Sequence, residues 1–533
     1  MTKRSTPNAI ELEVFRHLFT ALAEEMGAAL KRASFSPNIK ERRDYSCALF
    51  NPAGESVSLG DHMPVHLGAM PMSVEAALTE LGSLAPGDVA CLNDPFHGGT
   101  HLPDITLISA VYGVDEKLLG YVASRAHHSD VGGSTPGSMP LAREIYEEGL
   151  RIPPVRLYTH GVRNDDLWRL ILANVRTPIE RGGDLDAQLA ALHTGTTRLL
   201  EIAARKGSAN TLAAMDALIQ YADRLVAAGL ELIPDGRYEG VDAIEDDGFG
   251  SGPVPIRALL TIEGSKLVID FEGSSPQVPG GVNAVAAITS SATRYVVRCI
   301  VEALLGETLP AGGGSMSSVT LLMPAGSVVN ANPPASVAAG NVETSQRITD
   351  VLFRGFAAAL PDLVPAQSQG TMNNLTVGGV DPRTGDVFAY YETVGGGMGA
   401  GPEGDGLSGV HVHMSNSLNT PIEALEHAYP FRITRYEIRY GSGGDGLRRG
   451  GDGLRRDLEV LGPATVTLLC ERRTVGPAGA RGGRDGAAGE NVLIRNGVEE
   501  RLPGKATFSV DAGDVVSIRS PGGGGWGTPT DAS

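Results

Sequence analysis

The chain is poor in cysteine, and its few cysteines stand in no recognisable pattern. Its 533 residues include only Cys47, Cys91, Cys299 and Cys470, and no CxxC pair occurs. This scattering excludes a zinc ribbon, a redox dithiol and a disulfide framework, and it predicts thiols buried in the core. Cys47 is the exception, because it lies three residues after Asp44, and a nucleophilic role is kept there as the weaker alternative.

Positive charge and long apolar runs are lacking as well. The chain has 62 acidic residues against 44 lysines and arginines, which gives a formal net charge of −18. Because an acidic surface repels phosphate backbones and anionic lipids, we expect neither nucleic acid nor a membrane surface as a partner. No run of 18 apolar residues occurs, and residues 1–7 are polar, unlike a signal peptide. These features predict a cytoplasmic protein.

A phosphate-binding loop is missing too, although the chain contains 70 glycines. The GxxxxGK[ST] motif does not occur, and the glycine-rich stretch 395–401 lacks its Lys-Ser/Thr ending. Residues 441–446 match GxGxxG after a strand-like segment, but the LRRGG that follows does not begin a helix, which disfavours a dinucleotide site. No nucleotide site is therefore predicted within this chain.

What the chain does have is a succession of helical and strand patterns, which predicts a mixed α+β, multidomain fold. Its length suits about three or four domains. We predict an N-terminal α/β region at 1–183, a helical hairpin at 184–235, a mixed α/β domain at 236–365 and a glycine-rich, mainly β domain at 366–533.

Helices are predicted where apolar residues recur every three or four positions. Residues 8–33 carry a strict i, i+4 apolar stripe behind an Asn8 cap, and this stripe should pack on the core. The further helical segments are a hairpin over 184–229, broken near Gly207, and helices near 285–305 and 341–360. At the start of the last helix, capping explains the residues Asn341, Glu343 and Thr344.

Two hairpins are predicted in the N-terminal region. The first spans 44–59 with a turn at 51–54. The second joins the apolar segments 105–112 and 118–124 through a turn at Gly113. The second hairpin would return the residues that follow it to the neighbourhood of those that precede it.

Histidine is concentrated around this second hairpin. Six of the twelve histidines fall within residues 62–128, and both His101 and His127 are followed three residues later by an aspartate, Asp104 and Asp130. Neutral imidazole and carboxylate groups without thiolates suit Zn²⁺, Mn²⁺ or Fe²⁺. We therefore predict a metal or catalytic site here. For any one histidine taken singly, a loop position satisfied by hydrogen bonds is the alternative.

Other polar residues are candidates for acid and base catalysis or for substrate contacts. His97, Asp94 and His128 are the acid–base candidates, because a histidine beside a carboxylate can titrate near neutral pH. For Asp94, the opening of a turn before a proline is the favoured alternative. His411 and His413 lie two apart on an apparent strand, where a substrate-pocket role competes with polar packing.

The C-terminal region contains a short repeat. GGDGLRR occurs twice in succession over 443–456, and its arginines either bind an anion or a partner surface or belong to a solvated turn. Residues 520–527, SPGGGGWG, have the composition of a flexible terminal loop.

Six of these segments together resemble the hydantoinase B/oxoprolinase family, whose relatives include the large subunits of acetone and acetophenone carboxylases. They span nearly the whole chain in the family's order, and the resemblance implies a hydantoinase B-like fold. The segments are NDPFHGGTHLPD (93–104), SRAHHSDVGG (124–133), PGSMP (136–140), NVETSQRITD (341–350), GGGMGAGPEGDGLSGVHVHMSN (395–416) and SPGGGGWG (520–527).

The resemblance also implies a partner and a metal. In that family a hydantoinase A-type subunit carries the ATP site, which agrees with the missing phosphate loop and implies a hetero-oligomer. The family's divalent metal falls here on Asp44, His101, Asp104 and His127, with Asp130 as a further candidate ligand or neighbouring carboxylate.

The activity implied is that of a subunit of an ATP-dependent cyclic amide hydrolase of the N-methylhydantoinase or 5-oxoprolinase type. ATP would activate the ring carbonyl, and metal-assisted water would open the ring. The alternative enzyme is an ATP-dependent ketone carboxylase, whose large subunit shares these motifs. A scaffold subunit with a vestigial histidine cluster is the non-enzymatic alternative.

Overall fold

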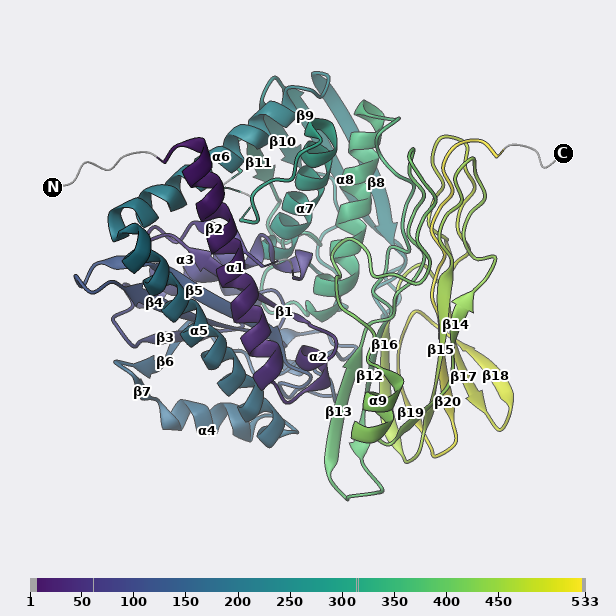
Figure 1. The fold of residues 1–533 in the computed structure, drawn as a ribbon. Coiled ribbons are helices and arrows are strands. Elements are labelled where there is room, and N and C mark those ends of the chain that lie inside the picture. The colour runs from purple at the N-terminus through teal and green to yellow at the C-terminus, as the bar shows by residue number, and fades with distance from the viewer. Residues whose placement is uncertain (1–6, 61, 313, 315, 530–533) are drawn as a thin grey trace.

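The computed structural model describes residues 7–60, 62–312, 314 and 316–529. It contains helices and several sheets, which confirms the predicted α+β class. Figure 1 shows a helix-rich N-terminal part beside a mainly β C-terminal part. Among the described residues, none of the helices combines the length and apolarity needed to span a bilayer.

The N-terminal sheet is antiparallel and has the strand order β2-β1-β5-β4-β3-β6-β7. Both predicted hairpins are confirmed, as β1–β2 and β4–β5. The strands are β1 (Tyr45–Phe50), β2 (Ser56–Leu59), β3 (Val89–Leu92), β4 (Asp104–Tyr112), β5 (Leu118–His127), β6 (Val155–Thr159) and β7 (Val162–Arg163).

Helices cover both faces of this sheet, because its strands are apolar on both sides. Ile105 and Leu107 of β4 share a core with α1 and α5, whereas Ile108 and Ala110 face α3. The helices of this part are α1 (Ala9–Ala33), α2 (Pro37–Lys40), α3 (Ala69–Leu81), α4 (Asp165–Ala173), α5 (Pro178–Lys206) and α6 (Ser208–Leu230), with short 3-10 turns at Pro64–His66, Pro95–His97 and Ile145–Glu147.

The first helix follows the prediction in extent but not in its buried face. Asn8 caps α1 as predicted, yet Ile10 is 79% exposed and Val14 is 41% exposed, while Leu22 and Met26 are buried. A strict i, i+4 stripe advances about 40° too far at each step, since four residues turn through about 400°. The predicted stripe therefore winds around the helix, and only its C-terminal half faces the core.

The helical hairpin is confirmed, with its break at Gly207, whose φ is 86°. Its first helix begins earlier than predicted, at Pro178, because proline fits the first turn of a helix. The next elements are α7 (Ala286–Leu305), α8 (Ser345–Ala359) and a sheet in the order β11-β10-β9-β8, formed by β8 (Gly236–Ile244), β9 (Val254–Glu263), β10 (Lys266–Asp270) and β11 (Val319–Leu322).

The capping interpretation of the segment before α8 is wrong. A π-helical turn, Gly340–Thr344, precedes α8, and no side chain caps either element. Glu343 instead accepts hydrogen bonds from the Met372 N–H and the Asn374 amide, and Thr344 donates to the Val282 carbonyl. Glu343 and Thr344 therefore form hydrogen bonds with residues distant in sequence instead of the local capping bonds that were expected.

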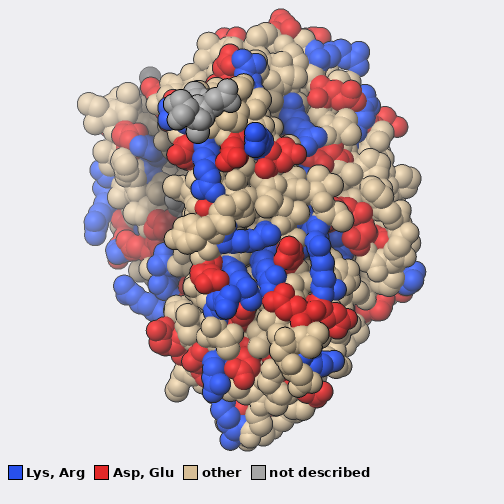
Figure 2. Space-filling model, turned by 90° about the vertical axis from the view of Figure 1, so that its right-hand side faces the viewer, with Lys and Arg blue, Asp and Glu red and all other residues tan. Residues whose placement is uncertain are grey.

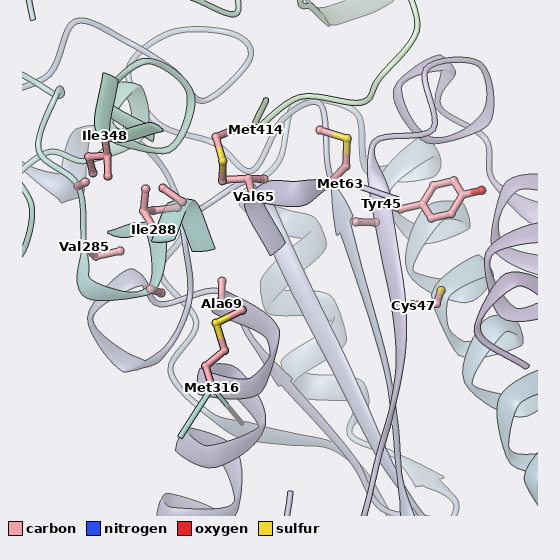
Figure 3. Packing of buried hydrophobic residues seen from close by; sticks show 14 of the residues in the cluster. Tyr45, Cys47, Met63, Val65, Ala69, Val285, Ile288, Met316, Ile348 and Met414 are labelled. Carbon is pink, nitrogen blue, oxygen red and sulfur yellow. The ribbon is translucent and has the colours of Figure 1, made fainter. Parts of the chain in front are cut away.

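One large hydrophobic core joins the regions predicted at 1–183, 184–235 and 236–365. Figure 3 shows part of it, with Tyr45 and Cys47 on the strand side and Ile288 and Ile348 on the helix side. The predicted domain boundaries stay a prediction.

The C-terminal part is mainly β, as predicted, and has its own core between two sheets. Figure 2 shows acidic and basic side chains interleaved on the face of the molecule turned toward the viewer. Arg519 and Glu499 are one ion pair of the C-terminal part. The sheets have the orders β13-β12-β16-β19 and β14-β15-β20-β17-β18. Their strands are β12 (Asn374–Val380), β13 (Val387–Glu392), β14 (Phe431–Arg439), β15 (Gly453–Val460), β16 (Ala464–Leu469), β17 (Glu490–Arg495), β18 (Val498–Leu502), β19 (Lys505–Val510) and β20 (Val515–Arg519), with the helix α9 (Ile422–Ala428).

Four glycine-rich loops, 395–409, 441–453, 476–489 and 520–527, pack on one another through their backbones (Figure 1). The hydrogen bonds that join them include Gly397 N–H to Pro521 O at 3.0 Å, Gly444 N–H to Gly523 O at 2.9 Å and Gly525 N–H to Arg484 O at 2.9 Å. We call these four segments the glycine loops.

The prediction of a flexible terminal loop at 520–527 is wrong, because most of this segment is buried among the other glycine loops. Glycine is required there by close approach, since a Cβ at Gly523 would collide with the Met398 carbonyl. Three of the four arginines of the repeat form ion pairs within the chain: Arg449 with Asp452, Arg455 with Asp457 and Arg456 with Glu392.

Candidate functional site

Three strand ends bring the central residues of the site together. Asp104 is the first residue of β4 and His127 the last of β5, and the two are direct cross-strand partners. Asp44 precedes β1, and its carbonyl accepts a hydrogen bond from the His127 N–H at 3.0 Å. His101 lies in the loop before β4, where its carbonyl accepts from the Asp104 N–H at 3.1 Å. The sheet register thus gathers four residues that are scattered in the sequence.

The side chains of these four residues converge on a small cavity. His101 Nε2 lies 3.2 Å and His127 Nδ1 lies 3.4 Å from the same oxygen, Asp104 Oδ1. Asp44 Oδ2 is 4.0 Å from His127 Nδ1. All four side chains are buried, and Asp44, Asp104 and His127 line a cavity with a volume of about 10 Å³, while His101 reaches it through its contact with Asp104. Such a volume holds one water molecule or one ion.

Burial and mutual contact set the charges of this cluster. Burial raises the pKa of Asp44, although His127 and Arg42 oppose the change. Burial also opposes ionisation of Asp104, but its hydrogen bonds and charge interactions with the neighbouring histidines outweigh this and hold its pKa well below the ordinary value. Burial lowers the pKa of His127, which favours the neutral imidazole that binds metals.

Two more residues belong to the cluster, and the sequence analysis missed both as site residues. His66 Nε2 lies 3.4 Å from Asp104 Oδ2, and its Nδ1 lies 2.8 Å from Ser46 Oγ. His66 has no aspartate three residues later, so the spacing gave no signal. The amide nitrogen of Asn341 lies 3.1 Å from His101 Nε2, which replaces the capping role expected for it.

The donor set fits a divalent metal ion. One potential ligand atom from each of His101, Asp104 and His127 lies within 4.8 Å of the others. No lysine or arginine is among the described residues that line the cavity, although two carboxylates, Asp44 and Asp104, are buried there. Imidazole nitrogen and carboxylate oxygen together suit Zn²⁺, Mn²⁺ or Fe²⁺. A cation would balance both carboxylates.

Asp130 and His128 lie close in sequence, but neither lines this cavity. Both carboxylate oxygens of Asp130 bind Arg176, whose side chain lies at 2.9 Å, so Asp130 anchors a loop. His128 Nε2 lies 2.9 Å from Gln188 Oε1, while the Gln188 amide donates to two backbone carbonyls. Burial lowers the pKa of His128 to about 4, which keeps it neutral.

His97 and Asp94 form a histidine–carboxylate pair outside the small cavity. Asp94 Oδ2 lies 2.9 Å from His97 Nδ1, so the expected histidine–carboxylate contact is present. Asp94 also caps the 3-10 turn Pro95–His97, as the favoured turn interpretation predicted. The His97 side chain is 48% exposed, and neither residue lines the small cavity.

The cysteines include no candidate nucleophile in this cluster. Cys47 is fully buried in the large core, and burial raises the pKa of its thiol to about 12. A thiol that stays protonated at neutral pH is a poor nucleophile. Cys299 differs from the predicted core thiols, since it is only partly buried and lines a second cavity.

This second cavity lies next to the first and has a volume of about 490 Å³. Ser415 lines both cavities. The volume falls in the range of small-molecule sites, about 300–1,000 Å³. His411 and His413 both line it, but no strand contains them, and His413 has a φ of 54°. The lining is mixed and includes Tyr295, Phe353, Met398, His411, His413 and Ser415.

The fold and this geometry define a multidomain α+β protein with a candidate His/Asp metal centre at the end of a sheet, beside a ligand-sized cavity. The chain belongs to the hydantoinase B/oxoprolinase family, whose family model matches residues 8–529.

Relatives and solved structures agree with this assignment. An uncharacterized protein of Methanocaldococcus jannaschii is 39% identical over 98% of this chain and 91% of its own length. The 5-oxoprolinase 1 of Arabidopsis thaliana is 40% identical, but the chain spans only 42% of that relative's length. The ATP-dependent caprolactamase of Pseudomonas jessenii matches with a TM-score of 0.90 at 30% identity, over 98% of this chain and 92% of that chain. An acetone carboxylase matches with a TM-score of 0.88 at 20% identity, over 98% of this chain and 76% of that chain, which shows the fold alone.

Proposed function

We propose that this chain is the subunit of an ATP-dependent cyclic amide hydrolase, of the N-methylhydantoinase or 5-oxoprolinase type, that carries the hydrolysis site. The proposal rests on one observation: His101, Asp104 and His127 form a buried cluster, and Asp44, Asp104 and His127 of this neighbourhood line a small cavity beside a ligand-sized one. The caprolactamase likeness supports the same reaction class.

An ATPase subunit of the hydantoinase A type is the proposed partner. The sequence has no phosphate-binding loop, so activation by ATP requires another polypeptide. The chain matches only 42% of the Arabidopsis 5-oxoprolinase, and the remaining length of that relative can hold an ATP-binding part. Here we expect that part as a separate subunit in a hetero-oligomer.

The division of labour follows from amide chemistry. An amide carbonyl is a poor electrophile, and phosphorylation of its oxygen turns that oxygen into a leaving group. A bound Zn²⁺, Mn²⁺ or Fe²⁺ would orient water, lower its pKa and stabilise the developing oxyanion. Asp44, His101, Asp104 and His127 would hold this ion.

Neighbouring groups hold the ligands in place. Tyr391 stacks on His127, with ring centroids 4.4 Å apart and planes at 13°. His66 Nε2 contacts the second carboxylate oxygen of Asp104, Oδ2. Contacts of this kind fix the orientation of metal ligands. Proton transfer by His97, Asp94 or His128 stays a prediction.

The test is to co-express the chain with an ATPase-like subunit and to supply lactams, hydantoins and 5-oxoproline with ATP. We expect ATP-dependent ring opening, with solvent oxygen in the new carboxylate. Acetone or acetophenone with labelled bicarbonate is tried in parallel. Label in a β-keto acid without any ring opening would overturn the proposal in favour of a ketone carboxylase.

A further inference from the structure

A hydrogen-bonded pair of side chains joins the two cavities. Ser415 lines both, whereas His411 lines only the larger one. Ser415 Oγ and His411 Nδ1 are 3.0 Å apart. The Nε2 atom of His411 is buried and has no hydrogen-bond partner among the described residues. Ser415 thus borders both cavities, and the His411 residue that it contacts borders the larger one.

We propose that Ser415 and His411 relay a proton from the attacking water, in the small cavity, to the ring nitrogen of a substrate bound in the large cavity. This inference rests on the proposed function and adds to it the route by which the leaving nitrogen is protonated. His411 is then a catalytic residue, because its Nε2 touches the substrate.

Ring opening requires such a proton. The water oxygen bonds to the ring carbon that bears the phosphorylated oxygen, and the ring C–N bond then breaks with its electron pair on nitrogen, which leaves an acyl phosphate. An amine anion is too strong a base to leave, so nitrogen must gain a proton as the bond breaks. The protons lost by the attacking water are gained by nitrogen, and a second water cleaves the acyl phosphate into the carboxylate and inorganic phosphate.

Each of the two relay residues gains one proton and loses one. Ser415 Oγ takes the proton from water and gives its own to His411 Nδ1, while His411 Nε2 gives its proton to the ring nitrogen. The imidazole stays neutral but ends with its proton on Nδ1. Proton exchange with water in the large cavity returns it to the starting form.

A chain of hydroxyl groups orients the relay. Arg42 Nη2 donates to Thr393 Oγ1 at 2.6 Å, and a guanidinium can only donate. Ser417 Oγ lies 3.0 Å from Thr393 Oγ1 and 3.3 Å from Ser415 Oγ. Arg42 Nη2 also donates to Ser417 Oγ at 3.4 Å. In the proposed relay, donation runs from Arg42 through Thr393 and Ser417 to Ser415, and on to His411 Nδ1. This order leaves the imidazole proton on Nε2, the end without a partner.

The charge state of His411 agrees with a relay. Burial lowers its pKa to about 3, and Arg42 lowers it further, although the nearby Asn419 side chain opposes the shift. The imidazole is thus neutral at physiological pH. A neutral ring can accept a proton on one nitrogen while it gives one from the other.

The test uses the complex with its ATPase partner and the variants Ser415→Ala, His411→Asn and His411→Gln. Asparagine keeps a polar group in place of Nδ1, next to Ser415, but has none in place of Nε2. Glutamine keeps a polar group in place of Nε2 but has none in place of Nδ1. His193→Asn, at an exposed histidine of α5, is the matched control. Metal content and thermal unfolding midpoint are measured for every variant, so that misfolded proteins are recognised.

The decisive readout is how the loss depends on the ring nitrogen. For simple lactams we expect each relay variant to lower kcat at least about a hundredfold, the usual contribution of a positioned acid. For succinimide and hydantoins the loss should be at least tenfold smaller, because their nitrogen leaves as a weaker base.

Two outcomes separate the claims. If the wild-type complex opens no cyclic amide, the proposed function itself fails. If the wild type is active but folded, metal-replete variants keep their kcat, or lose it equally with every ring, the relay is overturned.

Discussion

A single carboxylate, Asp104, organises the centre of the candidate site. Its Oδ1 faces His101 and His127, while its Oδ2 faces His66 and accepts a hydrogen bond from Thr100 at 2.5 Å. Removal of its negative charge therefore affects several neighbours at once. An amide at this position could not balance the charge of a cation.

We expect the purified chain to hold about one transition-metal ion, and Asp104→Asn or His101→Ala to lower its metal content at least tenfold. Loss of a ligand removes both a bond and the geometry of the site. Elemental analysis and ring-opening assays with the partner subunit measure the effect. The His193→Asn variant should keep its metal. A wild-type chain without Zn, Mn, Fe or Co would contradict the metal assignment.

A second buried carboxylate, Glu148, gives a prediction about pH. It accepts hydrogen bonds from the Val337 and Ala338 N–H groups, at 2.7 and 3.0 Å, and from the Ser336 hydroxyl. Burial raises its pKa from 4.5 to about 7, against these hydrogen bonds. The folded chain therefore binds this proton more tightly than the unfolded chain does.

The stabilisation from protonated Glu148 should be complete below about pH 4.5 and should be lost as the pH rises to about 7. A Glu148→Gln variant lacks this titration, so its unfolding midpoint should rise relative to wild type across that window. The whole effect is on the order of 3 kcal/mol. Thermal unfolding at a series of pH values measures it, and two parallel pH curves would refute the assignment.

At the residue scale, spacing in the sequence found part of the site. His101 and Asp104 were recognisable because they lie three residues apart, and His127 because a hairpin returns it to Asp104. Asp44 was one of several aspartates near these histidines, and its role as a metal ligand came from the family resemblance. His66 and Asn341 were out of reach, since only the tertiary fold brings them to the cluster.

Among the elements, the glycine loops give the sharpest test of packing. A side chain at Gly523 would meet the Met398 carbonyl, whereas a Cβ at Gly404 would meet nothing within 4 Å. We expect Gly523→Ala to lower the free energy of unfolding by about 3 kcal/mol or more, because backbone cannot move aside cheaply. Gly404→Ala should change it by less than about 0.5 kcal/mol.

Denaturant unfolding of the two alanine variants, side by side, checks this prediction. Equal stability of both variants would mean that the loops tolerate side chains, contrary to the close backbone contacts described above.

Local sequence patterns predicted which segments form helices and strands better than they predicted what packs around those segments. The hairpins and the helical hairpin followed from turn residues and apolar periodicity, which are local signals. The segment 520–527 was misjudged, because its composition is that of a loose terminus while its hydrogen-bond partners lie far away in sequence. Composition describes a segment alone and says nothing of what surrounds it.

On the scale of the whole molecule, we expect ATP binding and ring opening to depend on a partner subunit. The isolated chain should neither bind ATP tightly nor open a lactam, since it lacks a phosphate loop. Co-expression with an ATPase-like subunit should give a hetero-oligomer that does both. Calorimetry and size-exclusion chromatography measure these properties, and micromolar ATP affinity of the isolated chain would count against the assignment.

The arrangement of the glycine loops also sets the order in which the C-terminal part can form during synthesis. Residues 520–527 hydrogen-bond to all three other loops, yet they leave the ribosome after them. Chains emerge N-terminus first and fold as they emerge. Until residues 520–527 have emerged, the other three loops therefore lack the backbone partners that this segment provides, and ribosome-bound chains that stop before residue 520 should be digested by proteases at 395–409, 441–453 and 476–489.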